Sequence, residues 1–582
     1  MPRFYFLLAL LPFALLSCNS VAQPDFYNGK HFSHRDTLLG NYSYARTCYD
    51  VTHYNLSVRI HPDTHTIEGQ NVVSFRAVSI FDKLQLDLDE NLAIDSIIYR
   101  RQPTALGIPA AFKRDEVAIF ITMPEVQKPN STAQLTVYYK GKPRIAKKAP
   151  WDGGMVWATT DDGKPWVGVA CEGDGASLWY PCKDGINDEP DSARITLEVP
   201  TGLTGVSNGR LVDTRALPDT FTRFTWQVTY PINNYDITLN VANYAHFTDT
   251  YTSPEGGTPL ALDYYVLPRN LAKAQKQFAQ VQPMLAIYEK YFGKYPFWRD
   301  GYKLVETPYL GMEHQSCIAY GNQYKRGYLG GLVPSEFNFD FIIIHESGHE
   351  YFGNAVTARD HAELWLHESF TTYMEALYVE ERYGKEAAIR YLESQKKLIV
   401  GEEPIIGPLG VRYGKCTGSD MYYKGTWMLH TLRNCVNDDE KWFRTLRNFY
   451  DASKYRTVSS RDFYNQLSRT CGRDYSTILD LYLTYRRIPT LHYSLKQRGR
   501  KLIVRYQWET NITGFTMPIA FGNPKNYTRV EAKTQYAQEV EINDLRLADF
   551  RVATELFLVN TIEDAQPLTL PKPQKPQPKP KK

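Results

Sequence analysis

The spacing of apolar residues changes twice along this 582-residue chain, and these changes restrict the folds open to it. From about residue 49 to 266, apolar and polar residues alternate in short runs, so that Tyr54, Leu56, Val58 and Ile60 share one face. This two-residue period is typical of half-buried strands. From about 271 to 485 the apolar residues recur three and four apart, as in amphipathic helices, and alternation returns after residue 488.

These periods predict a multidomain α+β protein, which agrees with a length too great for one hydrophobic core. The expected units are an N-terminal β domain of sandwich or saddle type, a mainly helical domain and a small C-terminal β domain. A Pro/Lys-rich tail follows, and its composition cannot build a core. The corresponding ranges are 23–266, 267–487, 488–565 and 566–582.

Residues 1–22 are expected to form an export signal. Arg3 precedes an apolar run that ends at Leu16, and this run is shorter than the ~20 residues that a membrane span needs. Two cleavage patterns are open. "LLSC" resembles a bacterial lipobox and would place a lipid on Cys18, whereas "SVA" before Gln23 resembles an ordinary signal-peptidase site. The position of Cys18 directly after the apolar run favours an outer-membrane or cell-surface lipoprotein over a periplasmic or secreted protein.

Charge and cysteine content exclude some classes of site. The formal net charge of +3 includes five lysines in the last twelve residues, so the rest of the chain is slightly acidic and does not favour nucleic-acid binding. Beyond Cys18, seven cysteines remain, none in a C-x-x-C pair. A cysteine zinc cluster is therefore not expected, and any disulfide pairing stays open.

The stretch "FIIIHESGHEYFGN" carries a candidate metal site. Residues four apart on a helix lie one above the other, so His345 and His349 would present two imidazoles to one point. Zinc accepts such nitrogen ligands, and Glu346 would lie beside the pair, able to reach a water without being a ligand. The alternative is a polar helix face that carries two histidines by chance.

A catalytic zinc site needs a third protein ligand. Glu368 is the candidate, on a second expected helix from about 362 to 383, with Gly384 at its C-terminal end. Glu375 lies two turns farther along the same face, where it could accept a hydrogen bond from the second nitrogen of a ligand histidine. The alternative for Glu375 is an exposed helical carboxylate.

At these residues the chain resembles a known family. The H-E-x-x-H motif of "HESGHEYFGN" ends at His349, and eighteen residues separate it from Glu368 in "WLHESF". This pattern is similar to the gluzincin aminopeptidases of peptidase family M1, such as aminopeptidase N and leukotriene hydrolase. Tyr351, His367 and Ser369 replace the family's usual tryptophan, asparagine and glycine. The resemblance covers about residues 45–560. It implies an N-terminal β saddle, a thermolysin-like catalytic domain, a small β sandwich and one Zn²⁺ per chain.

The resemblance extends to residues that would bind the substrate. "YLGMEHQ" resembles the G-x-M-E-N motif, which makes Glu313 the carboxylate that holds the substrate's free α-amine, with Gly311 and Met312 lining the edge beside it. "VACEGDG" suggests Glu172 as a second amine anchor. "DMYYKG" resembles the Y-x-K-G segment and selects Tyr422. A carboxylate–ammonium pair is strong in a water-poor cleft, so this assignment also has a physical basis.

The family mechanism then implies a zinc metalloaminopeptidase that acts on peptides with a free N-terminus. Zinc held by His345, His349 and Glu368 would activate a water, Glu346 would act as general base and acid, and Tyr422 would stabilise the oxyanion. Three alternatives stay open. They are a thermolysin-type endopeptidase, an epoxide hydrolase and a zinc-free binding protein on the same fold. The side chain preferred at the first substrate residue is not predicted.

Overall fold

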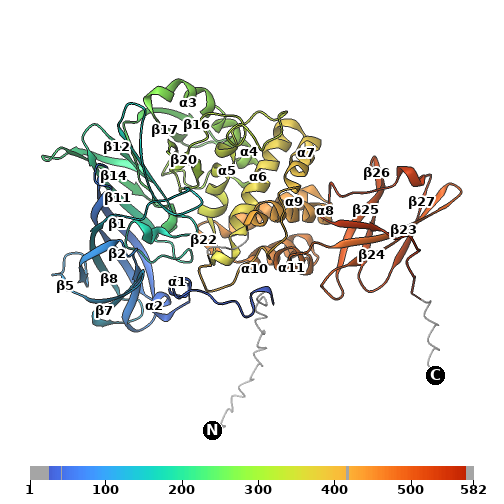
Figure 1. The fold of residues 1–582 in the computed structure, drawn as a ribbon, viewed down its shortest axis with the longest axis horizontal. Coiled ribbons are helices and arrows are strands. Elements are labelled where there is room, and N and C mark those ends of the chain that lie inside the picture. The colour runs from blue at the N-terminus through green and yellow to red at the C-terminus, as the bar shows by residue number, and fades with distance from the viewer. Residues whose placement is uncertain (1–24, 41, 414–417, 572–582) are drawn as a thin grey trace, which may run out of the picture.

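The computed structural model describes residues 25–40, 42–413 and 418–571. The expected signal segment with Cys18 and the lysines of the tail lie outside these residues. Three parts follow one another across the molecule (Figure 1): sheets of the N-terminal segment, a central group of helices, and two small sheets near the C-terminus. Among the described residues, no helix combines the length and the apolar character needed to cross a bilayer.

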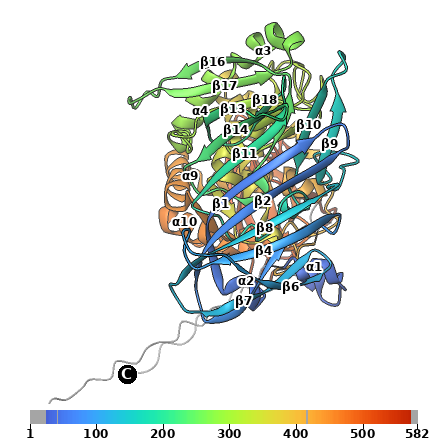
Figure 2. The same ribbon diagram turned by 90° about the vertical axis from the view of Figure 1, so that its left-hand side faces the viewer.

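A broad eight-stranded sheet dominates the N-terminal part, and Figure 2 views it face on. Its order is β13 (Arg210–Ala216), β14 (Phe221–Val228), β11 (Ser192–Pro200), β1 (Tyr49–His61), β2 (Thr66–Ala77), β8 (Thr132–Gly141), β4 (Leu92–Arg100) and β5 (Ile108–Pro109). The face of β1 that the alternation predicts is buried, with Tyr54, Leu56, Val58 and Ile60 all fully enclosed. Burial of these side chains fixes the register, because a one-residue shift would expose them all.

Two smaller sheets complete the N-terminal part. One contains β3 (Phe81–Asp87), β7 (Ala118–Gln127) and β6 (Ala111–Asp115), and the other contains β12 (Thr204–Val206), β15 (Asn240–Ala242), β10 (Pro165–Ala170) and β9 (Gly154–Thr159). Short helices α1 (His34–Leu38) and α2 (Tyr44–Thr47) precede them. The loop between β10 and β11 carries Glu172.

A five-stranded sheet links the N-terminal strands to the helical part. Its order is β16 (Ala245–Tyr251), β17 (Leu260–Val266), β18 (Tyr302–Glu306), β20 (Ile318–Tyr320) and β19 (Gly311–Met312). The short strand β19 is therefore an edge strand, paired on one side only within this sheet. An edge strand keeps one row of backbone N–H and C=O groups free for another extended chain.

The central part is mainly helical and contains the expected metal-binding helix, α5 (Phe341–His349). Its helices are α3 (Leu271–Phe278), α4 (Val281–Phe292), α5, α6 (Trp365–Tyr383), α7 (Lys385–Lys396), α8 (Tyr423–Val436), α9 (Asp439–Ser453), α10 (Ser460–Cys471) and α11 (Ser476–Thr484), with a small sheet of β21 (Val356–Ala358) and β22 (Arg456–Val458). The expected second helix begins at Trp365, because His361–Glu363 form a separate 3-10 turn. It ends at Tyr383 and is capped by Gly384, whose φ of 91° favours glycine.

Two facing sheets form the C-terminal part, as expected for a small sandwich. One contains β27 (Gln538–Asn543), β24 (Lys501–Glu509), β23 (Thr490–Arg498) and β29 (Asn560–Glu563), and the other β26 (Asn526–Lys533), β25 (Thr516–Asn523) and β28 (Arg551–Val552). The alternation in "ATELFLV" (residues 553–559) predicts a strand, but this stretch is not one. Phe557 and Leu558 instead enter the core from an irregular segment. The six cysteines that the structure describes are all free thiols.

Candidate active site

Helix α5 presents His345 and His349 to the same point. Asp340 begins the helix, and its side chain accepts hydrogen bonds from the N–H groups of Ile342 and Ile343 at 3.1 and 3.4 Å. Such a cap satisfies donors that the first turn leaves unpaired. Every residue of α5 is buried, so the helix is fixed by packing on all sides. The Nε2 atoms of His345 and His349 lie 3.2 Å apart.

Glu368 on α6 completes a triangle of donor atoms. Its Oε2 lies 3.5 Å from Nε2 of His345 and 3.3 Å from Nε2 of His349. A tetrahedral zinc with ligands at about 2.0–2.2 Å sets its ligand atoms about 3.3–3.6 Å apart, which matches the triangle. The buried Glu368 Oε2 also lacks a hydrogen-bond partner among the described residues. The two nitrogens and one oxygen therefore fit a zinc ion.

The charges around the triangle favour a cation. Burial by itself lowers the pKa of His345, but the adjacent carboxylates of Glu368 and Glu375 outweigh it and raise this pKa well above its usual value. Burial likewise lowers the pKa of His349, yet the charges of Glu313 and Glu368 raise it to about 9. Positive charge is thus stabilised at this point, as a divalent cation requires.

Glu375 supports the first histidine from behind. Its Oε1 lies 2.6 Å from Nδ1 of His345, while its Oε2 accepts hydrogen bonds from Tyr391 and Gln395 at 2.6 and 3.1 Å. The carboxylate is fully buried rather than exposed. It therefore fixes the ring orientation and keeps the Nε2 lone pair of His345 directed at the triangle.

Replacing Glu375 with glutamine is expected to weaken zinc binding about 10–100-fold, because the amide holds the His345 ring and its proton less firmly. Competition with a chelator of known affinity measures this change. Glu380→Gln on the same helix is the control, since Glu380 pairs with Arg433 rather than with a histidine. Equal zinc affinity in the Glu375 variant and the original chain would contradict this role.

Glu346 lies between the triangle and strand β19. Its Oε1 is so close to Gly311 that a Cβ there would lie 2.7 Å from it, which explains the glycine. Burial raises the pKa of Glu346 to about 7, against the opposing charge of His345. Ligand atoms of Glu313, Glu346 and His349 all lie within 4.8 Å of one another. The structure thus places the Glu313 carboxylate next to the centre, with its Oε1 buried and unpaired among the described residues.

A cavity of about 750 Å³ opens onto these groups. Glu172 reaches it from the N-terminal part, and Gly311 and Met312 line it from the edge strand. Burial and the charge of Glu313 raise the pKa of Glu172 well above its usual value. Tyr422 stands just before helix α8, with its ring centroid 6.1 Å from that of His345. Tyr423 lines the same cavity. All ten candidate site residues are therefore brought to one region.

The three residues that depart from the usual motif make contacts away from the triangle. His367 Nε2 accepts a hydrogen bond from the Ala358 N–H at 2.7 Å, and the Ser369 hydroxyl donates to the Met421 carbonyl at 2.5 Å. Tyr351 likewise donates its hydroxyl to the Gly293 carbonyl at 3.0 Å. These substitutions leave the donor triangle unchanged.

The sequence interpretation missed Tyr235, which approaches the centre from the N-terminal part. A Cβ on Gly353 would lie 3.7 Å from its hydroxyl, and this buried hydroxyl has no partner among the described residues. Burial and the charges of Asp236 and Glu313 raise its pKa well above the usual value. Tyr235 lies in no recognisable motif. With 42 tyrosines in the chain, the sequence offers no ground for selecting this one.

Comparison with known families identifies the same two parts. Residues 51–235 match the Peptidase M1 N-terminal domain, and residues 277–482 match the Peptidase family M1 domain. The second match contains the donor triangle. The chain belongs to peptidase family M1. Mouse aminopeptidase B is 28% identical over 284 residues, and human aminopeptidase B is 24% identical over 448 residues.

Solved M1 structures share this fold. An M1 zinc metallopeptidase from Deinococcus radiodurans superposes with a TM-score of 0.63 at 19% identity, covering 76% of this chain and 95% of that one. A variant of that metallopeptidase bound to a Tyr-Ser-Ala substrate superposes with a TM-score of 0.62 at 18% identity, covering 76% of this chain and 96% of that one. The sequence matches to aminopeptidase B are partial. The mouse match covers 46% of this chain and 40% of the mouse protein, and the human match covers 72% of this chain and 62% of the human protein. The expected M1 fold is confirmed.

Proposed function

We propose that this M1 protein is a zinc-dependent aminopeptidase that removes single residues from the free N-terminus of peptides. One observation carries the proposal. The carboxylate of Glu313 lies within 4.8 Å of ligand atoms of both Glu346 and His349, so a group suited to an ammonium stands beside the metal centre. A peptide whose amine pairs with Glu313 would then place its first peptide bond beside Glu346 and the metal centre.

His345, His349 and Glu368 would hold the zinc ion, which when bound supplies a Lewis acid and lowers the pKa of a coordinated water. Glu346 accepts a proton from the water that attacks the first peptide carbonyl. It then delivers that proton to the leaving nitrogen as the C–N bond breaks. A pKa near 7 suits a group that must both accept and donate.

Tyr422 and the edge strand would hold the reacting peptide bond. Tyr422 lines the cavity with its ring near His345, and its hydroxyl would donate a hydrogen bond to the oxygen that becomes negative in the transition state. The free edge of β19, at Gly311 and Met312, can pair with the substrate backbone. Glycine at 311 lets Glu346 stand close to that backbone.

Glu313 and Glu172 would bind the α-ammonium together. Both carboxylates line the cavity, and each has one buried oxygen without a hydrogen-bond partner among the described residues. A substrate amine supplies the missing donors and a compensating charge. A blocked N-terminus would leave these acids unpaired, which costs several kcal/mol and favours free peptides.

The relatives agree with this class of reaction. Aminopeptidase B is named for removal of N-terminal residues, and one solved M1 metallopeptidase was crystallised with a Tyr-Ser-Ala substrate. The main alternative is an endopeptidase. It shares the zinc ligands and Glu346 but has no use for an amine anchor, so Glu313 is the residue that separates the two activities.

Hydrolysis of aminoacyl-arylamides with and without a zinc chelator tests the proposal. The free-amine substrates are expected to be cleaved, the chelator to abolish cleavage, and added zinc to restore it. N-acetylated versions of the same compounds should be cleaved at least ~10²-fold more slowly, because they lose the charge-assisted pair. Equal cleavage of blocked and free substrates would favour the endopeptidase.

A further inference from the structure

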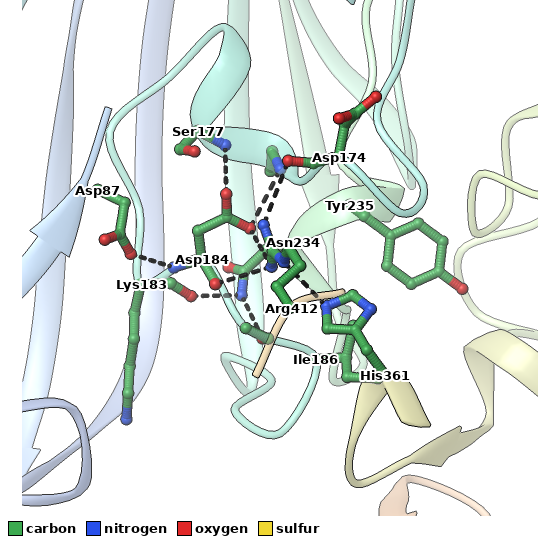
Figure 3. Close-up of polar contacts among 12 residues, drawn as sticks. Asp87, Asp174, Ser177, Lys183, Asp184, Ile186, Asn234, Tyr235, His361 and Arg412 are labelled. Carbon is green, nitrogen blue, oxygen red and sulfur yellow. Dashed lines mark hydrogen bonds and ion pairs between the residues drawn. The ribbon is translucent and has the colours of Figure 1, made fainter. Parts of the chain in front are cut away.

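Arg412 connects two parts of the chain that line the same cavity but lie far apart in sequence (Figure 3). It belongs to the segment between α7 and α8 that leads to Tyr422. Its guanidinium donates to the carbonyl of Asp174 at 3.2 Å and to both the carbonyl and the Oδ1 of Asp184, at 2.9 and 3.0 Å. Both acceptors lie in the β10–β11 connection that carries Glu172.

Asp184 is hydrogen-bonded in turn to residues 171–177, which we call the Glu172 loop. Its two carboxylate oxygens accept hydrogen bonds from the N–H groups of Ala176 and Ser177 at 3.2 and 3.1 Å. Within the loop, the N–H of Gly175 donates to the Cys171 carbonyl at 2.7 Å. Arg412 and Asp184 therefore hold the backbone on the C-terminal side of Glu172.

The loop is shaped to receive the guanidinium. Gly175 has a φ of 97°, and a Cβ at this position would overlap both the Arg412 side chain and the Asp184 carboxylate. Only glycine satisfies both the backbone angle and the close approach. Burial alone would raise the pKa of Asp184, but Arg412 and the loop N–H groups outweigh it and hold the pKa at about 2, so the pair stays charged.

Arg412 also contacts the catalytic side of the cavity. Its Nε donates to Nε2 of His361 at 3.2 Å, and His361 begins the 3-10 turn that leads into α6 and Glu368. The side chains of Arg412 and Asp184 are only 5% and 2% exposed. A buried ion pair of this kind adds little net stability, since desolvation of the two charges offsets their attraction. Fixing the position of the loop is a better account of its presence.

We propose that Arg412 is a positioning residue that, through Asp184 and the Asp174 carbonyl, holds Glu172 at the amine-binding end of the cavity. This inference rests on the proposed function, in which Glu172 binds the substrate ammonium. Because that contact is made both before and during reaction, a displaced Glu172 should raise KM and leave kcat nearly unchanged.

The test uses Arg412→Lys. Lysine keeps the positive charge, but its ammonium cannot reproduce the planar guanidinium that donates hydrogen bonds to Asp174, Asp184 and His361 at once. With a free aminoacyl-arylamide, KM is expected to rise about 10-fold while kcat stays within about 3-fold. Amides of the Glu172 loop should also exchange their hydrogens faster. Asp184→Asn gives a second route to the same loop and should shift KM in the same direction, even if the lysine variant folds poorly.

Arg433→Lys is the matched control. Arg433 is also 5% exposed and pairs with Glu380 and Asp439, but it does not line the cavity. The Arg433→Lys variant should be less stable, but its KM and the hydrogen exchange of its Glu172 loop should be unchanged. A double variant with Glu172→Gln completes the test, since Arg412→Lys should then raise KM no further.

Three results would overturn the inference. The first is an unchanged KM in Arg412→Lys. The second is an equal rise in KM when Arg412→Lys is made in the original chain and in the Glu172→Gln variant. The third is unaltered hydrogen exchange in the Glu172 loop. Failure of the proposed function has a different signature. In that case Glu172→Gln alone would leave KM and the preference for free amines unchanged, while Arg412→Lys would still accelerate exchange in the loop.

Discussion

Replacing Glu346 with glutamine is expected to lower kcat by ~10³–10⁴-fold while the chain still binds one zinc ion. The amide cannot accept the proton of the attacking water or return it to the leaving nitrogen. Zinc binding should persist because Glu346 is not one of the three donors that form the triangle. KM should change little, since the lost interaction operates mainly in the transition state.

Steady-state kinetics and metal analysis of the same preparation measure these quantities together. Glu363→Gln is the matched control, because Glu363 is a buried carboxylate that accepts a hydrogen bond from the Ser460 N–H at 2.7 Å and does not line the cavity. The control should retain kcat. Turnover by the Glu346 variant at the rate of the original chain would remove this residue from the mechanism.

The Glu313→Gln variant should lose ~10²–10³-fold in kcat/KM with free-amine substrates, because a buried charge-assisted pair is worth several kcal/mol. The residual activity on N-acetylated substrates should not fall, so the preference for a free amine should nearly disappear. Stability should be retained, since Glu313 Oε1 makes no hydrogen bond with the described residues that the amide could break.

Measurements of kcat/KM on paired free and acetylated substrates test this expectation. Glu172→Gln should produce the same change to a smaller degree, since Glu172 is the less buried of the two anchors. If Glu313→Gln lowered kcat/KM equally for the free and the acetylated substrate, the residue would serve the reaction itself rather than recognition of the amine.

Local patterns predicted much of this molecule because they report on burial and on spacing along single elements. The alternation in β1 follows its buried face, and the four-residue spacing of His345 and His349 follows from one helical turn. Glu368 could be selected because it lies on a recognisable second helix within a known motif. In each case the determining contact is local or belongs to a family signature.

Other features depend on contacts that no local pattern records. Phe557 and Leu558, in the alternating stretch 553–559, enter the core without forming a strand, because their packing does not require strand geometry. Arg412 and Asp184 are 228 residues apart in the sequence, so no local pattern links them. Their pairing follows from how the N-terminal sheets pack against the helices, which a one-dimensional period cannot specify.

The most direct test of aminopeptidase activity is digestion of one peptide in two forms, with a free and with an acetylated N-terminus, followed by mass spectrometry. We expect the free peptide to be shortened by one residue at a time from its N-terminus, while the acetylated peptide stays intact. Internal fragments, or equal shortening of both forms, would contradict this activity.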